Sequence, residues 1–221
     1  MKDLKAIRGR YLIDRLIAEG EHETQDFKFA ISDARKIARS LSAFANRSGG
    51  RLLIGVKDNG AIAGVRNEED IYVIEQAASM YCRPAQQLRF TAFRAGEGEG
   101  AIVIRAEIDP SAERPVQAMD IDGRWKSYFR VADENILASP LMVKAWRRRA
   151  SSEPMQLSVG VVEQTLLSML RERESVSPDD FITAACVSRR LGEDIITRLY
   201  ALGVIDFVFG PDRKFHLTAT T

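Results

Sequence analysis

Apolar residues recur at helical spacing between residues 34 and 45, which predicts an amphipathic helix that ends at Ala45. Arg35 and Arg39 are one helical turn apart, so they share the polar face of this helix. Residues 46–50 (Asn-Arg-Ser-Gly-Gly) follow and favour a turn, because Asn and Gly tolerate positive φ. We therefore expect the chain to turn directly from the helix into the next element.

A continuous apolar stretch after this turn predicts a buried strand at residues 51–56. Asp58-Asn59-Gly60 is typical of a hairpin turn, and residues 61–65 would then return beside the first strand. The helix, the turn and the predicted hairpin form one unit between residues 42 and 65. Within this unit the helix is expected to pack on the first strand.

Further helices and strands are predicted up to residue 150, which we take as one domain, residues 1–150. Residues 96–100 (Gly-Glu-Gly-Glu-Gly) are expected to form a flexible turn. They do not suit a phosphate-binding loop, because no Lys-Ser or Lys-Thr follows and no helix begins there. The other predicted elements are helices at residues 3–19 and 67–81, strands at 24–29, 87–93, 101–108 and 124–130, and a closing helix.

A change in composition near residues 147–154 (Arg-Arg-Arg-Ala-Ser-Ser-Glu-Pro) is typical of a linker, which we place at residues 151–157. The second domain, residues 158–221, shows three helical patterns and then two short strands around a Gly-Pro-Asp-Arg turn. This order of elements is similar to a winged helix. The predicted segments are residues 158–173, a short helix that begins at Ser177, 189–202, 204–209 and 214–217.

The composition is that of an ordinary water-soluble protein. Of the 221 residues, 45% are hydrophobic and 29% are charged, and no apolar run reaches the length of a membrane span. We therefore expect a cytoplasmic protein that does not enter a membrane. Cys82, Cys186, His22 and His216 form no cluster with metal-ligand spacing, which disfavours a zinc site and a disulfide framework.

Basic residues cluster between residues 28 and 57, although the whole chain is nearly neutral. The net charge is +1, from 32 basic and 31 acidic residues, which is low for a protein that binds phosphates. Within the cluster, only Asp33 opposes the positive charges. The pattern predicts a local surface for phosphate contacts, although charges that serve solubility alone would give the same pattern. Its members are Lys28, Arg35, Lys36, Arg39, Arg47, Arg51 and Lys57.

Several short motifs together resemble the Schlafen AlbA-like domain (AlbA_2). They are Glu-x-x-x-x-Asp-Phe-Lys at residues 21–28, the unit at 42–65, Ile-Asp-Pro-Ser at 108–111 followed by Arg-Pro-Val at 114–116, and Tyr-Phe-Arg-Val at 128–131. The resemblance covers about residues 10–145. It implies an α+β fold with a mixed sheet, nucleic acid as the partner, with DNA expected, and a role as a transcriptional regulator. It also marks Arg130 as a polar strand position for nucleic-acid binding.

Some animal members of this family are endoribonucleases with three carboxylates, and the matching positions are Glu21, Asp26 and Asp58. Converging carboxylates repel one another unless a cation lies between them. The resemblance therefore implies a Mg²⁺ or Mn²⁺ site if the chain is a nuclease, and no cofactor if it is not. Lys28 would project from the same strand face as Asp26 and could stabilise negative charge. Glu21 would also suit a solvated loop and Asp58 the start of a turn, and Glu23 could replace Glu21.

The second domain carries basic residues where a winged helix would meet DNA. The third helix of such a domain enters the major groove, and the hairpin contacts the backbone. Glu193 and Asp194 on the predicted third helix oppose this function, so a dimerisation or docking module is the alternative. The candidate DNA-binding residues are Arg189, Arg190 and Arg198 on that helix, and Arg213 and Lys214 at the turn of the hairpin.

Three functions are therefore open from the sequence. The first is a nucleic-acid-binding transcriptional regulator that recognises DNA. The second is a metal-dependent endoribonuclease that uses the three carboxylates, and the third is an interaction module without catalysis. We also expect a homodimer, because one modest basic surface repeated across a two-fold axis could hold a duplex despite the near-neutral net charge.

Overall fold

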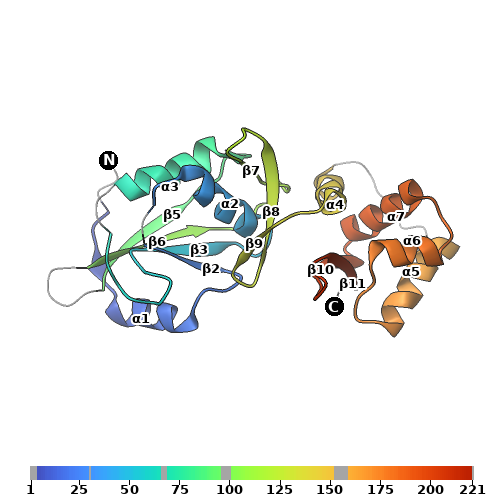
Figure 1. Cartoon of the computed structure of the whole chain (residues 1–221), viewed down its shortest axis with the longest axis horizontal. Helices are drawn as coiled ribbons and strands as arrows, with labels where there is room; N and C mark the ends of the chain where they lie inside the picture. The colour runs from blue at the N-terminus through green and yellow to red at the C-terminus, as the bar shows by residue number, and fades with distance from the viewer. Residues whose placement is uncertain (1–3, 30, 66–68, 96–100, 152–158, 221) are drawn as a thin grey trace. The chain divides into compact units, whose positions relative to one another are not determined.

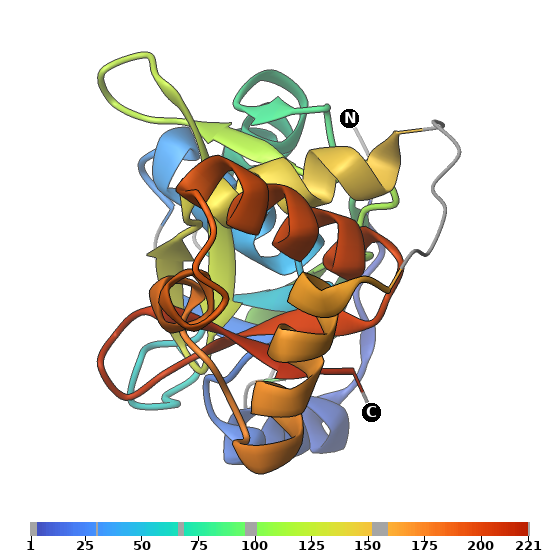
Figure 2. The same ribbon diagram turned by 90° about the vertical axis from the view of Figure 1, so that its right-hand side faces the viewer.

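The computed structural model describes residues 4–29, 31–65, 69–95, 101–151 and 159–220. The chain divides into two units, Met1–Ala138 and Ser139–Thr221. This division precedes the boundary expected at residue 150, because helix α4 (Pro140–Ala150) packs against helix α7 (Arg189–Ala201), as Figure 2 shows. Helix α4, which the sequence assigned to the first domain, thus belongs to the second unit. Most of the expected linker at residues 151–157 lies outside the described residues.

The first unit is built on a five-stranded mixed sheet (Figure 1). The outer pairs of strands, β1–β5 and β2–β3, are parallel, whereas β6 is antiparallel to both of its neighbours. This confirms the predicted α+β class with a mixed sheet. The strand order is β1 (Ile7–Arg8), β5 (Arg89–Arg94), β6 (Ile102–Ile108), β3 (Gly50–Ile54) and β2 (Gln25–Lys28).

Helices cover both faces of this sheet. Side chains alternate between the two faces along each strand. Leu53 and Phe93 pack on one face with α1 (Arg10–Glu19), and Leu52 and Ile54 pack on the other with α2 (Ala34–Ala45) and α3 (Glu69–Met80). Figure 1 shows α1 below the sheet and α2 and α3 above it. Strand β3 is therefore a central strand that is buried on both faces.

A second, antiparallel sheet packs against α2. Asn46, at the C-terminal end of α2, joins the helix to this sheet. Its Nδ2 donates to the carbonyl oxygens of Val116 (2.8 Å) and Tyr128 (2.9 Å), and its Oδ1 accepts from the Val116 N–H (2.8 Å). Ser42, one turn earlier, donates to the Val116 carbonyl and accepts from the Tyr128 N–H. The strands of this sheet are, in order, β4 (Cys82–Arg83), β7 (Gln117–Met119), β8 (Trp125–Val131) and β9 (Glu134–Leu137).

The turn between α2 and β3 depends on two glycines. Gly49 has a φ of +75°, and a Cβ atom at this position would lie 2.6 Å from the carbonyl oxygen of Ile108. At Gly50, a Cβ atom would lie 2.5 Å from a carbon atom of the Phe44 ring. The predicted positive-φ turn is confirmed at Gly49, and the absence of both side chains lets the turn approach β6 and α2 closely.

Two predicted elements differ from the structure. Residues 61–65 do not form a second hairpin strand, apart from one bridge between Val56 and Ile62, because β2 and β6 already occupy both edges of β3. The helix predicted at residues 3–19 begins only at Arg10, and residues 7–8 form β1 instead. Gly9 separates the two, where a Cβ atom would lie 2.3 Å from the Phe93 ring of β5. The turn predicted at residues 96–100 lies outside the described residues.

The second unit contains the three predicted helices and the two-stranded antiparallel hairpin. Its core includes Trp146 of α4 together with Leu166, Phe181 and Leu199. Across the described parts of both units, no helix is long and apolar enough to cross a membrane. Besides α4 and α7, the elements are α5 (Val161–Glu172), α6 (Pro178–Ala184), β10 (Ile205–Phe209) and β11 (Phe215–Ala219).

Candidate nucleic-acid interface

Two of the three predicted carboxylates meet beside β2. Asp26 is almost fully buried, and its Oδ2 lies 2.8 Å from the Nζ of Lys28 and 3.2 Å from the Oγ of Ser40. Glu21 lies between α1 and β2, where its Oε1 accepts a hydrogen bond from the Phe27 N–H (2.8 Å). The carboxyl groups of Glu21 and Asp26 also share a hydrogen bond. The structure thus brings Glu21, Asp26 and Lys28 together.

The pKa values of these two carboxyl groups are shifted in opposite directions. Burial, and then the hydrogen bond to Asp26, raise the pKa of Glu21 above its usual value. Burial by itself would also raise the pKa of Asp26. The hydrogen bond with Glu21, the ammonium of Lys28 and the charge of Arg130 outweigh burial and lower the pKa of Asp26. Glu21 is therefore the member that keeps its proton to higher pH, and Asp26 loses its proton at lower pH than Glu21 does.

Arg130 lies inside the fold next to this pair. Its side chain is 1% exposed, and its Nη2 lies 3.6 Å from the Oδ1 of Asp26. Its nitrogen atoms donate to the Oδ1 of Asn135 (2.9 Å) and to the backbone carbonyl oxygens of Gln25 (3.3 Å) and His22 (3.4 Å). This corrects the expectation that Arg130 contacts nucleic acid, because a phosphate group cannot reach a buried guanidinium that the protein itself surrounds.

The third predicted carboxylate does not join the other two. Asp58 is exposed in the turn after β3, and Glu23, the alternative ligand, forms an ion pair with Arg47. Among the residues that the structure describes, no three His, Cys, Asp or Glu side chains are placed so that they could hold a metal ion. The Mg²⁺ or Mn²⁺ site expected at Glu21, Asp26 and Asp58 therefore does not fit the geometry.

Part of the predicted basic cluster is neutralised by acidic side chains. The sequence could not show this, because two of the acids come from the end of α1 and the segment after it, far from their partners along the chain. The neutralising ion pairs are Arg47–Glu23, Arg51–Glu19 and Lys28–Asp26.

Lys57, another member of the predicted cluster, is exposed, and its Nζ lies 5.2 Å from the centre of the Phe29 ring.

Arg35, Lys36 and Arg39 lie in the first two turns of α2, where Lys36 is exposed and the two arginines are half-buried. The guanidinium of Arg35 lies 5.3 Å from the centre of the Tyr81 ring, which fixes the cation over a flat aromatic side chain. Lys36 is exposed and lies between the two arginines along the helix. The helix predicted from the sequence therefore presents Arg35 and Arg39 together, as expected.

Lys126 of β8 lies near this group, although the sequence did not single it out. It forms an ion pair with Asp120 (2.5 Å), and the charge of Arg39 also acts on Asp120. The alternation of side chains along β8 could have indicated that Lys126 lies on the side of the strand that faces α2. Lys126 and Tyr128 share one face of the strand, and Tyr128 is buried against α2. Because Asp120 already neutralises Lys126, we name only Arg35, Lys36 and Arg39 the α2 basic surface.

Helix α7, the predicted DNA-reading helix, is largely covered within the second unit. Arg198 forms an ion pair with Glu163, a carboxylate that is only 6% exposed. Helix α4 lies along α7, where the Nη1 of Arg148 bonds to the Oγ1 of Thr197 (3.1 Å) and to the carbonyl oxygen of Asp194 (3.1 Å). Arg198 and the middle of α7 are therefore committed to contacts inside the unit.

Of the basic residues predicted to bind DNA in the second unit, the exposed ones lie near the start of α7 and at the hairpin turn. Arg189 and Arg190 lie in the first turn of α7, and Arg189 forms an ion pair with Asp179 (2.7 Å). Arg213 and Lys214 are exposed between β10 and β11. The structure does not bring these residues onto one continuous helix face with Arg198.

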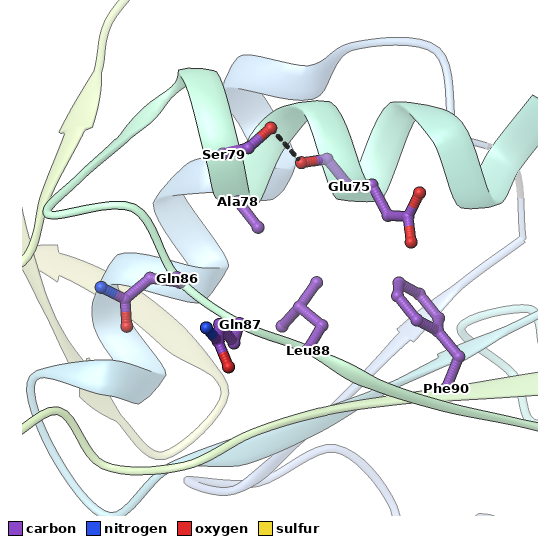
Figure 3. Close-up of a pocket in the computed structure, with 7 residues that line it drawn as sticks. All are labelled: Glu75, Ala78, Ser79, Gln86, Gln87, Leu88 and Phe90. Atoms are coloured by element: carbon purple, nitrogen blue, oxygen red, sulfur yellow. Dashed lines mark hydrogen bonds between the residues drawn. The ribbon is translucent and has the colours of Figure 1, made fainter.

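A hollow of about 430 Å³ lies between α3 and the segment that leads into β5 (Figure 3). Figure 3 shows the Ser79 hydroxyl donating to the backbone carbonyl of Glu75 at its rim. None of the residues singled out from the sequence lines this hollow, so it is not part of the candidate interface. Its lining combines Ala78, Leu88 and Phe90 with Glu75, Ser79, Gln86 and Gln87.

Comparison with known proteins identifies the family of the first unit. A profile of the family described as "Schlafen, AlbA_2" matches residues 21–139, more than half of the chain. The chain belongs to the Schlafen AlbA_2 family. The Schlafen AlbA_2 match ends within one residue of the end of the first unit, so it excludes α4 and the elements that follow it.

No curated protein matches the chain. Among solved structures, the chain is similar to the DIP2311 protein from Corynebacterium diphtheriae, with 21% sequence identity and a TM-score of 0.44. The similarity covers 90% of this Schlafen AlbA_2 protein and 34% of DIP2311, so the chain spans about a third of the length of that protein. Similarity at this level adds nothing to the functional argument.

Proposed function

We propose that this Schlafen AlbA_2 protein binds nucleic acid through the α2 basic surface, that duplex DNA is its partner, and that it regulates transcription. The observation that carries the proposal is the placement of Arg35, Lys36 and Arg39 on the first two turns of one helix, while several other predicted cations are paired or buried. Cations that the protein does not neutralise can displace counterions from phosphate groups. Family membership supports the same reading.

Fluorescence anisotropy with a short labelled DNA duplex at several salt concentrations tests this proposal. The logarithm of the affinity is expected to fall linearly with the logarithm of the salt concentration. The double substitution Arg35→Gln and Arg39→Gln should weaken binding and reduce the salt slope by about 1.8, which is two phosphate contacts at about 0.9 each. Arg47→Gln is the matched control, because Glu23 already neutralises Arg47. An unchanged affinity in the double variant would contradict the proposal.

A second candidate function is cleavage of nucleic acid at the Glu21–Asp26 pair. The observation that favours it is the placement of both carboxyl groups beside the Lys28 ammonium, with the pKa of Glu21 raised by burial and the pKa of Asp26 lowered by its hydrogen bond with Glu21 and by Lys28. Lys28, 2.8 Å from Asp26, would stabilise negative charge on a phosphate group. In this candidate Glu21 exchanges the proton, and Asp58 has no part.

Incubation of a labelled RNA hairpin with the protein, once with Mn²⁺ and once with a chelator, tests cleavage. Glu21→Gln is expected to abolish the products because it removes the exchangeable proton, whereas Asp58→Asn should leave them unchanged. Intact RNA under both conditions removes this candidate. Loss of activity in Asp58→Asn would instead restore the three-carboxylate hypothesis.

For the second unit we propose docking or dimerisation, not base reading. The support is the ion pair between Arg198 and the buried Glu163, together with the cover that α4 gives to α7. Light scattering on the full chain should show a dimer. Replacing Arg190 and Lys214 by Gln should leave the affinity for DNA nearly unchanged, and a loss as large as that of the α2 variant would contradict this proposal.

A further inference from the structure

Strand β2 lies at one edge of the five-stranded sheet, and none of the described strands lies beside its outer side. The carbonyl oxygens of Thr24 and Lys28 point inward, where they accept hydrogen bonds from residues 51 and 55 next to β3. Because backbone groups alternate in direction along a strand, those of Gln25 and Phe27 point outward. An open row of outward groups can pair with a strand of another protein molecule.

The first part of this outer row is covered by the turn that precedes β2. The Gln25 N–H donates to the carbonyl of His22 (3.2 Å), and the His22 N–H donates to the carbonyl of Gln25 (3.0 Å). The Nη2 of Arg130 also donates to the Gln25 carbonyl (3.3 Å). Another strand could therefore reach Gln25 only if this turn moved away.

The outward groups of Phe27 are covered by two charged side chains. The Phe27 N–H donates to the Oε1 of Glu21 (2.8 Å), and the Phe27 carbonyl accepts from the Nζ of Lys28 (2.8 Å). A neighbouring strand would use the same two backbone groups, with its own carbonyl as acceptor and its own N–H as donor. Glu21 and Lys28 thus occupy the positions that a sixth strand would need.

Asp26 holds both of these side chains in place. Its carboxyl group shares a hydrogen bond with that of Glu21, and its Oδ2 lies 2.8 Å from the Nζ of Lys28. Asp26 is 5% exposed and is itself fixed by the Oγ of Ser40 (3.2 Å) and by Arg130. The two covering side chains are therefore anchored to one carboxyl group inside the fold.

We propose that Glu21 and Lys28 close the β2 edge against the addition of another strand, and that Asp26 is the residue that positions them. Without these two side chains, the β2 edges of two copies of this chain would pair across a two-fold axis. This role does not depend on nucleic-acid binding. It also differs from cleavage at the same residues, because Glu21 closes the edge as a hydrogen-bond acceptor and not as a proton donor.

Hydrogen exchange at the Phe27 amide, measured by NMR, and light scattering over a range of protein concentrations test this proposal. In Glu21→Ala the Phe27 amide loses its acceptor, so its exchange in dilute protein should be at least about tenfold faster. At higher concentration this variant should associate beyond the state of the unmodified protein, and the Phe27 amide should become protected again. Glu21→Gln keeps an oxygen acceptor and should show neither additional association nor the full loss of protection.

Lys28→Ala provides an independent test, because it opens the Phe27 carbonyl and leaves Glu21 in place. Circular dichroism confirms that each variant is folded. Glu113→Ala and Lys5→Ala are the matched controls, since both residues are exposed and lie outside the β2 edge. The proposal is overturned if Glu21→Ala and Lys28→Ala associate no more than the unmodified protein, or if the two controls associate equally. Glu21→Gln separates the two roles, because it should prevent cleavage and still keep the edge closed.

Discussion

At the scale of single residues, Arg130 holds several parts of the first unit together. From β8 it reaches Asp26 of β2 and Asn135 of β9. Ser40 of α2 links Asp26 and Asn135 to each other. Its Oγ donates to the Oδ2 of Asp26 and accepts a hydrogen bond from the Nδ2 of Asn135 (3.0 Å). A buried ion pair of this kind is stable only while both charges and their hydrogen bonds are in place.

Arg130→Lys is therefore expected to lower the free energy of unfolding by about 3 kcal/mol, the loss typical of a broken buried pair. A single ammonium cannot replace a planar guanidinium that serves three acceptors. Urea unfolding followed by circular dichroism measures the change. Arg124→Lys is the control, since Arg124 is exposed. Equal midpoints for the two variants would contradict the structural role of Arg130.

The two cysteines should differ in reactivity. Burial raises the pKa of the Cys82 thiol to about 12, whereas Cys186 is exposed. Because the thiolate is the reactive form, iodoacetamide at neutral pH should label Cys186 in the folded protein and Cys82 only after denaturation. Peptide mass spectrometry identifies the labelled residue. Labelling of Cys82 in the folded Cys186→Ser variant would show that the site around Cys82 opens.

The sequence predicted single residues well where their partners are close along the chain. Glu21, Asp26 and Lys28 belong to one short motif, and the structure places them together. The acids that neutralise Arg47 and Arg51 lie far from them along the chain. Glu23 precedes Arg47 by 24 residues, and Glu19 precedes Arg51 by 32 residues. A pattern of nearby residues contains no information on such pairs, so the sequence could not show that Arg47 and Arg51 have acidic partners.

At the scale of elements, the contact between α2 and the second sheet depends on Asn46. Its side-chain amide is fully buried. It forms hydrogen bonds with backbone groups of Val116, just before β7, and of Tyr128 in β8. Removing the amide would leave these backbone groups without partners in a place that water does not reach.

Asn46→Ala is expected to cost more than about 2 kcal/mol of unfolding free energy, because each buried group left unpaired costs about 1–3 kcal/mol. Asn46→Asp should be nearly as harmful, since a carboxylate cannot donate to the carbonyl oxygens of Val116 and Tyr128. Chemical denaturation provides the measurement. Asn59→Ala, in an exposed turn, is the control and should change the midpoint little. A tolerated Asn46→Ala would show that Ser42 alone holds the sheet.

The sequence predicted well those helices whose apolar residues repeat at helical spacing. It did not predict strands that exist only because they pair with a distant strand. Helices α2 and α7 follow from apolar residues at helical spacing, and their observed bounds agree closely with prediction. Strand β1 has two residues and no alternation, so only its pairing with β5 makes it a strand. The antiparallel partner of β3 was misassigned for the same reason, because β6 lies about 50 residues later along the chain.

At the scale of the whole molecule, the placement of α4 decides where the chain can be divided. Helix α4 contributes Trp146, which is 2% exposed, to the second unit, and the Schlafen AlbA_2 match ends just before this helix begins. Loss of a large buried aromatic side chain typically costs about 3–5 kcal/mol.

A fragment of residues 139–221 is therefore expected to unfold cooperatively, whereas residues 151–221 should be much less stable or unfolded. Calorimetry on the two fragments makes the comparison. Trp146→Ala in the longer fragment serves as the control that separates packing from mere chain length. Equal melting temperatures for both fragments would show that α4 is dispensable to the second unit.

The residues that make the family recognisable are largely those that the backbone requires. Gly49 and Gly50 leave no room for a side chain, Asn46 pairs with buried backbone groups, and Arg130 is enclosed. Lys36, by contrast, is exposed and could be exchanged without disturbing the core. A shared signature of this kind therefore traces inheritance of a scaffold, and proteins that carry it are free to diverge in what they recognise.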